Sequence, residues 1–96
     1  MERFMVVCTF IDGTDMAEVM AVIPEEQAQV RRLEDEGLVG VISISMPRRT
    51  VFIETFAPDA ETAATTVKTL PMARWWELDV FPLGAAPAGE ASGPNS

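Results

Sequence analysis

Apolar residues in the first third of the chain follow two different periods. From Arg3 to Ile11 the chain is rich in Phe and Val on both faces and ends at Asp12-Gly13, a turn signal, which predicts a first strand. From Met16 to Leu33 apolar residues recur at the spacing of one helix face, and this pattern ends before Gly37. The sequence therefore opens with a strand that is followed by a helix.

Pro24 lies inside the helical pattern. Thr14 or Asp15 can cap the start of the helix. Pro24 either opens a second helical segment, with Glu25 and Glu26 in its first turn, or kinks one long helix. We favour the kink, because the apolar positions on both sides of the proline stay in phase.

Three further runs have the composition of strands. Leu38 to Met46 and Thr50 to Phe56 are rich in β-branched residues and flank Pro47-Arg48-Arg49, which can turn. These two runs predict a hairpin. Trp75 to Leu83 is the last predicted strand.

A short helix is expected between the hairpin and the last strand. Asp59 can serve as its N-cap, an apolar stripe runs from Ala60 to Leu70, and Pro71 stops it. The order strand, helix, strand, strand, helix, strand is the split βαβ plan of ferredoxin-like domains. We therefore predict an α+β fold of βαββαβ order, with a four-stranded antiparallel sheet and two helices on one face.

The alternation of side chains along strands assigns residues to the two faces of this sheet. The natural helix-facing residues are Met5, Val7, Ile42, Ile44, Val51, Ile53, Leu78 and Val80. The opposite face would then carry Phe4, Val6, Cys8, Phe10, Val41, Ser43, Ser45, Thr50, Phe52, Glu54, Phe56, Trp75, Glu77, Asp79 and Phe81. Because this second set is too apolar for open water, we predict that a partner sheet packs against it.

The length of the chain fits one domain. The chain has 96 residues, of which 48% are hydrophobic and 23% are charged. We expect a single domain over residues 1–83 and a tail over 84–96, rich in Ala, Gly, Pro and Ser, that is flexible or lies on a neighbouring subunit. A chain this short buries only about 60 to 65% of its unfolded surface, which also favours a homodimer or a higher homo-oligomer.

Charge and residue usage exclude several classes of function. Seven basic and fifteen acidic residues give a net charge of −8, which repels nucleic acids and anionic membrane surfaces. No stretch approaches the roughly 18 apolar residues of a membrane span, and Met1 to Phe10 has no long apolar signal region, so we expect a cytoplasmic protein. Cys8 is the single cysteine and the chain has no histidine, which excludes imidazole catalysis and a Cys/His nucleophile pair.

Metal and nucleotide motifs are absent from the sequence. Asp12-Gly13-Thr14-Asp15 lacks the length and the downstream Glu of a calcium-binding loop, and Gly37 and Gly40 do not form a phosphate-binding pattern. We therefore expect neither a metal ion nor an organic cofactor.

Two segments carry a resemblance to a known family. Pro24-Glu25-Glu26-Gln27 runs into Arg32-Leu33-Glu34-Asp35-Glu36-Gly37, and Thr69-Leu70-Pro71-Met72 leads to Leu78-Asp79-Val80-Phe81-Pro82-Leu83. With these segments the chain resembles the muconolactone delta-isomerase family of the dimeric α/β barrel superfamily. The resemblance implies that two such sheets pair into a dimeric α/β barrel, within a ring-like oligomer that has pockets near its subunit contacts.

The resemblance also implies a chemistry. Enzymes of this family shift a double bond in a small unsaturated lactone by abstracting and returning a proton, without a metal or an organic cofactor. Members with this activity carry a Trp-Arg pair in the second strand and an Asn in the third, where this chain has Ser43-Ile44 and Val51. An arginine and an amide are the groups that would hold a carboxylated lactone, so the resemblance leaves the identity of the substrate open.

Glu54 and Glu26 are the candidate catalytic bases. Glu54 lies mid-strand between Phe52 and Phe56, where partial desolvation would raise its pKa toward that of a useful base. The alternative is an exposed carboxylate at the sheet edge. Glu26 lies on the first helix, where the resemblance is close and where its carboxylate would reach a pocket between helix and sheet; the alternative is a charge that favours the helix dipole.

Five further residues are candidates for contact with a small-molecule substrate. Arg48 in the hairpin turn would meet an anionic substrate, and Trp75 beside Arg74 would stack on a planar one. The ordinary alternatives are a turn residue for the arginine and packing for the tryptophan. The other three candidates, on the face assigned to Glu54, are Ser43, Ser45 and Phe52.

The function that these features favour is cofactor-free proton transfer on a small unsaturated carbonyl or lactone compound, by isomerisation or cyclisation. The alternative enzymes are a polyketide-type cyclase and a cofactor-independent monooxygenase, since the same barrel superfamily contains both. From a different class, a non-catalytic small-molecule-binding or assembly subunit would explain the missing Trp-Arg and Asn.

Overall fold

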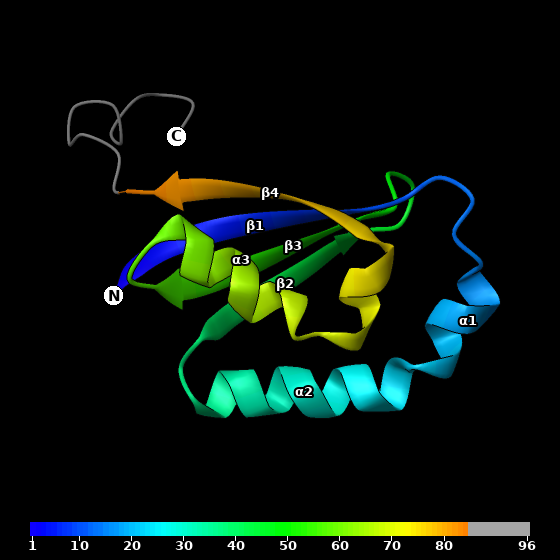
Figure 1. Cartoon of the computed structure of the whole chain (residues 1–96), viewed down its shortest axis with the longest axis horizontal. Helices are drawn as coiled ribbons and strands as arrows, with labels where there is room; N and C mark the ends of the chain where they lie inside the picture. Colours follow the sequence, from blue (N-terminus) through cyan, green and yellow to red (C-terminus); the bar gives the residue numbers. More distant parts are fainter. Residues whose placement is uncertain (85–96) are drawn as a thin grey trace, which may run out of the picture.

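The computed structural model describes residues 1–84, and the remainder of the predicted tail lies outside the described residues. Eight elements follow one another along this part of the chain (Figure 1). They are β1 (Glu2–Phe10), α1 (Met16–Ala21), α2 (Ile23–Asp35), β2 (Val39–Ser45), β3 (Thr50–Ala57), α3 (Ala60–Lys68), the 3-10 helix η1 (Pro71–Trp75) and β4 (Trp76–Leu83).

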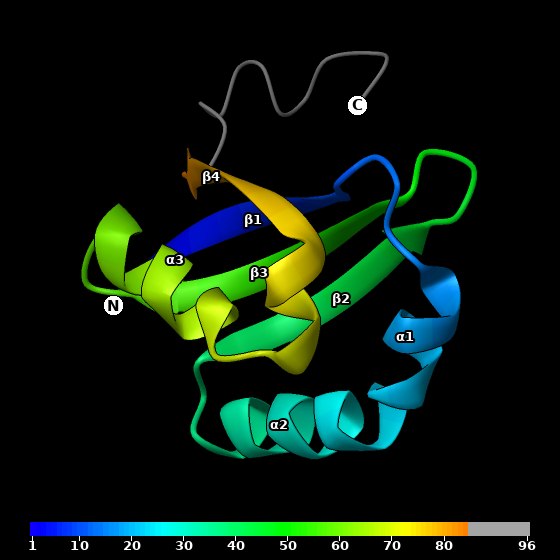
Figure 2. The same ribbon diagram turned by 45° about the vertical axis from the view of Figure 1, so that its right-hand side comes forward.

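The four strands form one antiparallel sheet in the order β2-β3-β1-β4. The first strand lies inside the sheet because both β3 and β4 pair with it, as the split βαβ plan requires. Figures 1 and 2 show α2 and α3 on one side of the sheet, while the other side carries none of the described helices. The predicted α+β fold is confirmed.

The single kinked helix that we favoured is wrong, because the structure has two helices. Val22, with φ −99° and ψ 5°, ends α1 and begins α2. Pro24 lies in the first turn of α2, where backbone N–H groups have no acceptor within the helix, so the N–H that proline lacks is not needed. The proline ring would clash with the backbone of a helix that continued on its N-terminal side. At the start of α1 the cap is Asp15, whose carboxylate accepts a hydrogen bond from the Ala17 N–H.

The two faces of β1 are the reverse of those that we predicted from the sequence. The residues of β1 that pack with the core on the helix-covered side are Phe4, Val6, Cys8 and Phe10. Val6 pairs with Ile53, and both are almost fully buried, whereas Met5 and Val7 are half-buried on the opposite face. The alternation itself carried the signal, because the face of Met5 and Val7 also carries Arg3 and Thr9, whereas Phe4, Val6, Cys8 and Phe10 on the other face are all apolar.

On the other three strands the helix-facing assignments are confirmed. Val51 and Ile53 are buried, and Ile42, Leu78 and Val80 pack against them as half-buried residues. Trp75, which we placed in the last strand, instead ends η1, and β4 begins at Trp76. Asp59 caps α3 as expected, since its carboxylate accepts a hydrogen bond from the Thr62 N–H at 2.7 Å.

Candidate functional site

A cavity of about 300 Å³ lies between α2 and the sheet. Ten residues line it: Ile23, Glu26, Gln27, Val30, Ile42, Ile44, Val51, Ile53, Met72 and Trp76. The four residues from α2 are spaced so that they share one helix face, and the four from β2 and β3 alternate along their strands. Met72 and Trp76 follow α3 and complete the wall, so three separate parts of the chain build the cavity.

Glu26 is the only ionisable residue in this lining. Its Oε1 accepts a hydrogen bond from the Met72 N–H at 2.9 Å, which fixes the carboxyl against η1. Burial raises the pKa of Glu26, and the hydrogen bond from Met72 offsets only part of this effect. A carboxylate whose pKa is raised in this way is a stronger base than an exposed glutamate, which suits it to take up and return a proton.

Cys8 lies in the core on the same side of the sheet. Burial, with a smaller contribution from the charge of Glu26, raises the pKa of its thiol to about 12. The thiolate is therefore scarce near neutral pH, and Cys8 serves as a small apolar core residue.

Trp76 is, with Gln27, a further polar residue of the cavity wall. Its side chain packs edge-on against Phe10, with ring centroids 5.9 Å apart and an interplanar angle of 78°. The residue is 7% exposed, and its Nε1 is the only buried side-chain nitrogen or oxygen within residues 1–84 that lacks a hydrogen-bond partner. A buried donor without an acceptor costs about 1 to 3 kcal/mol, so this N–H is an exception that calls for an explanation.

A second and more open hollow, of about 410 Å³, is also lined in part by Trp76. Lys68 and Arg74 belong to its lining, whereas neither belongs to the lining of the cavity beside Glu26. The two hollows therefore differ in charge.

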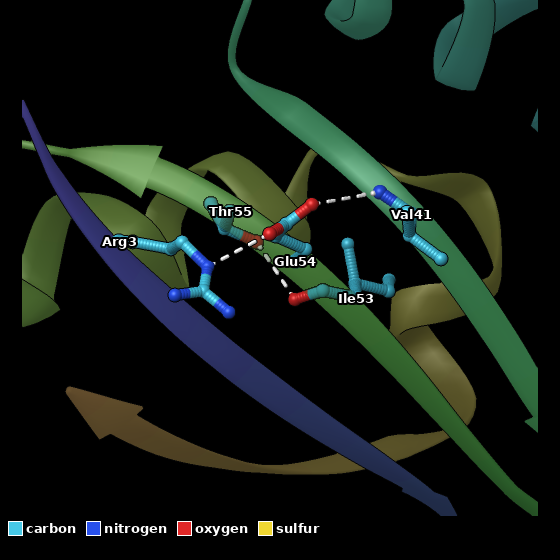
Figure 3. A network of polar contacts seen from close by, with 5 residues as sticks. All are labelled: Arg3, Val41, Ile53, Glu54 and Thr55. Atoms are coloured by element: carbon cyan, nitrogen blue, oxygen red, sulfur yellow. Dashed lines mark hydrogen bonds and ion pairs between the residues drawn. The ribbon is translucent and has the colours of Figure 1, made fainter. Parts of the chain in front are cut away.

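Glu54 lies on the opposite side of the sheet from the cavity, within a polar network that Figure 3 shows. Its Oε2 is 2.8 Å from Arg3 Nε, and its Oε1 accepts a hydrogen bond from the Val41 N–H at 3.1 Å. The Val41 bond, followed by the bond from Arg3, lowers the pKa of Glu54. Our expectation of a raised pKa for Glu54 was wrong, because Arg3 and the Val41 amide stabilise its charged form.

The other substrate-contact candidates also lie away from the cavity. Ser43 and Phe52 are register partners, so they share the helix-free face with Glu54, and Ser45 lies two residues further along β2 on that face. Arg48 is exposed in the hairpin turn. The Arg74 guanidinium lies 5.0 Å from the centre of the Trp75 ring.

The structure thus separates the residues that we grouped from the sequence. Of the seven candidates, only Glu26 lines the cavity. Met72 and Trp76 were missed as site residues because only the packing of η1 against α2 brings this part of the chain to the cavity, where the Met72 N–H reaches Glu26. The signal for Trp76 was two adjacent tryptophans ahead of an alternating strand, of which one had to face the core.

Two further findings concern the described part of the chain. Within it, no three Cys, Asp or Glu side chains lie close enough together to hold a metal ion. None of its helices has both the length and the hydrophobicity needed to cross a membrane.

Comparison with known proteins adds a fold relationship. No protein-family model matches the chain, and no curated protein matches it. A crystal structure of muconolactone isomerase aligns over 90% of this chain and 92% of that one, with a TM-score of 0.69 and 20% sequence identity. The two proteins share a fold. This relationship agrees with the resemblance seen in the sequence, and at this identity it extends to the fold alone.

Proposed function

We propose that this protein is an enzyme that moves a proton within a small unsaturated carbonyl or lactone compound, with Glu26 as the general base and without a cofactor. The observation that carries the proposal is the position of Glu26 as the sole ionisable group of a mostly apolar cavity, whose lining also includes Gln27. The muconolactone isomerase fold supports the same class of chemistry.

The reaction needs only one carboxyl group. The Glu26 carboxylate takes a proton from the carbon next to the carbonyl; the C–H bond breaks and its electron pair moves into the carbonyl to form an enolate. The protonated Glu26 then returns the proton to the far carbon of the conjugated system, which shifts the double bond and restores the carboxylate. Apolar walls exclude water, so the enolate is not quenched by solvent.

We propose in addition that the helix-free face of the sheet pairs with a second copy of the chain. Exposed apolar side chains on this side include Val41 and Phe81, which are 69% and 47% exposed, and Phe52 and Phe56 lie half-buried beside them. Light scattering at micromolar concentration should show a dimer or a larger oligomer. A monomer would contradict this pairing.

A matched pair of variants tests the catalytic proposal. Glu26→Gln keeps the shape of the side chain and an oxygen for the Met72 N–H, but removes the base. Glu25→Gln changes the neighbouring exposed carboxylate, which does not line the cavity. On a panel of unsaturated lactones and enolisable ketones, we expect Glu26→Gln to lose about 100-fold or more of the turnover and Glu25→Gln to retain it.

Proton exchange gives a second readout of the same step. In deuterium oxide, NMR should show exchange of the proton next to the carbonyl at a rate that falls with Glu26→Gln. Full activity of that variant, or a loss in Glu54→Gln instead, would contradict the role of Glu26. If the unaltered protein turned over no compound of the panel, the non-catalytic binding subunit would be the better description.

A further inference from the structure

The second hollow, of about 410 Å³, differs in charge from the cavity beside Glu26. Its two ionisable residues are Lys68 and Arg74, and both are basic. The chain carries fifteen acidic and only seven basic residues, so a hollow that gathers two bases and no acid runs against the overall charge. This local excess of positive charge favours an anionic occupant.

Different elements bring the two cations to this hollow. Lys68 is the last residue of α3, where a basic side chain also favours the helix dipole, whereas Arg74 lies in η1. The helix dipole therefore accounts for Lys68 but not for the second cation. The ion pair found within residues 1–84 joins Arg3 to Glu54, so no carboxylate of this part of the chain neutralises either cation of the hollow.

The acidic residues that follow Arg74 along the chain lie on the other face of the sheet. Glu77 and Asp79 alternate in β4 with Trp76 and Leu78, which pack with the core on the helix-covered side. An anion in the hollow therefore meets positive charge without an opposing carboxylate from the strand that helps to line it.

The Arg74 side chain is held in place by two contacts. Its Nε donates a hydrogen bond to the Pro71 carbonyl oxygen at 3.0 Å, and its guanidinium lies 5.0 Å from the centre of the Trp75 ring. The two terminal nitrogens of the guanidinium have no hydrogen-bond partner within residues 1–84. Such a pair of N–H donors matches the two oxygens of a carboxylate, and a guanidinium that is already oriented loses less entropy on binding one.

The rest of the lining is apolar. Leu70 and Trp76 are 3% and 7% exposed, and Leu78 is half-buried. The Trp76 Nε1 is buried, so this residue offers the hollow only the apolar surface of its ring. A volume of about 410 Å³ falls within the range of about 300 to 1,000 Å³ for small-molecule pockets. The hollow therefore suits an anion that also carries a small apolar group.

We propose that the second hollow binds a small carboxylate that carries one apolar ring. The carboxylate oxygens accept hydrogen bonds from the two terminal nitrogens of Arg74, and Lys68 adds a second positive charge. The ring lies against the apolar part of the lining. This site does not use Glu26, so the inference goes beyond the proposed function and does not depend on it.

Titration with benzoate, followed in ¹⁵N–¹H NMR spectra, tests the site. Benzamide has the same ring without the charge, and inorganic phosphate has charge without the ring. We expect benzoate to shift the backbone amide signals of Leu70, Arg74 and Leu78 with a Kd of about 1 mM, since the hollow is open to water. Benzamide and phosphate should each bind at least about 5-fold more weakly, because each lacks one of the two contacts.

Variants locate the contact. Arg74→Gln removes the paired donors and should weaken benzoate binding about 5-fold or more, and Lys68→Gln, which removes a single exposed charge, about 2- to 3-fold. Arg48→Gln removes the same charge from the exposed hairpin turn and should leave binding unchanged. If Arg74→Gln does not fold, Lys68→Gln and the signals of the unaltered protein still decide the question.

Several results would overturn the inference. Equally tight binding of benzamide would show that the cations are not used, and equally tight binding of phosphate would show that the ring is not. Shifts centred on Val30 and Ile44 would place benzoate in the cavity beside Glu26 instead. Unchanged binding in both variants of the hollow, or no binding at about 20 mM benzoate, would also contradict the site.

Failure of this inference is distinguishable from failure of the proposed function. Binding of benzoate in the hollow by a protein that turns over no lactone or ketone would contradict catalysis alone. Turnover that depends on Glu26, in a protein that does not bind benzoate, would contradict only the carboxylate site.

Discussion

The orientation of β1 can be tested by truncating two adjacent valines. Val6 is 0% exposed on the helix-covered face, and Val7 is half-buried on the opposite face of the same strand. Both substitutions to Ala remove the same atoms from an interior strand of the sheet. Any change in intrinsic strand propensity therefore largely cancels when the two variants are compared.

The expected loss at Val6 follows from its burial. Removing about two methylene equivalents costs about 1.6 kcal/mol at about 0.8 kcal/mol each. The space left behind adds about 1 kcal/mol, if about 40 Å³ stays unfilled at about 24 cal/mol per Å³. We expect Val6→Ala to lower the free energy of unfolding by about 2 to 3 kcal/mol, and Val7→Ala to lower it by less than about 1 kcal/mol in the monomer.

Urea denaturation followed by circular dichroism measures both losses. A loss of about 2 to 3 kcal/mol corresponds to a fall in Tm of roughly 8 to 24 °C for a domain of this size. Repeating the measurement over a range of protein concentrations separates the two faces. If copies pair through the helix-free face, the cost of Val7→Ala grows with protein concentration, because the variant then loses part of the association free energy. Equal losses for both variants in the monomer, or a larger one at Val7, would refute the orientation of β1.

Three further predictions concern single side chains. Because burial raises the pKa of Glu26, the folded state holds this proton more tightly than the unfolded state, and the stability that this gives is lost as pH rises through the folded pKa. In urea denaturation, Glu26→Gln should therefore gain stability relative to the unaltered protein as pH rises above the ordinary glutamate pKa of 4.5, and a difference that does not change with pH would count against it. Gly40→Ala should lower Tm, because the added Cβ would collide with the Glu54 carboxylate, which accepts a hydrogen bond from the Val41 N–H. In melting curves, combining Gly40→Ala with Glu54→Ala should remove most of the decrease that Gly40→Ala adds. Since burial raises the pKa of the Cys8 thiol to about 12, a thiol reagent at pH 8 should label Cys8 only as fast as the protein unfolds, and rapid labelling of the folded protein would contradict its burial.

The sequence by itself determined the order of the elements. Turn signals and side-chain periodicity located the strands and the α3 helix, and Asp59 marked the start of that helix. These features depend on residues a few positions apart, so local backbone preferences and alternation are enough to predict them. The α+β fold followed, because the βαββαβ order leaves few ways to pair four strands.

The position of Pro24 was less informative. In-phase apolar residues on both sides of it fit one kinked helix and two separate helices equally well. The choice depends on whether the backbone at Val22 leaves the helical conformation, and packing of α2 against β2 and η1 decides where that second helix lies.

The tertiary structure alone decided which side chains share a site. Arg3 is 51 residues from Glu54, and Met72 is 46 residues from Glu26, so neither partner could be read from local sequence. The surroundings shift the pKa values of the two carboxyl groups in opposite directions. The Val41 amide and the Arg3 guanidinium lower the pKa of Glu54, whereas burial raises the pKa of Glu26. For β1 the tertiary structure supplied the register rather than the faces. Arg3 and Thr9 mark the face of Met5 and Val7 in the sequence, and the pairing with β3 places Val6 opposite Ile53 and Cys8 opposite Val51 in the core.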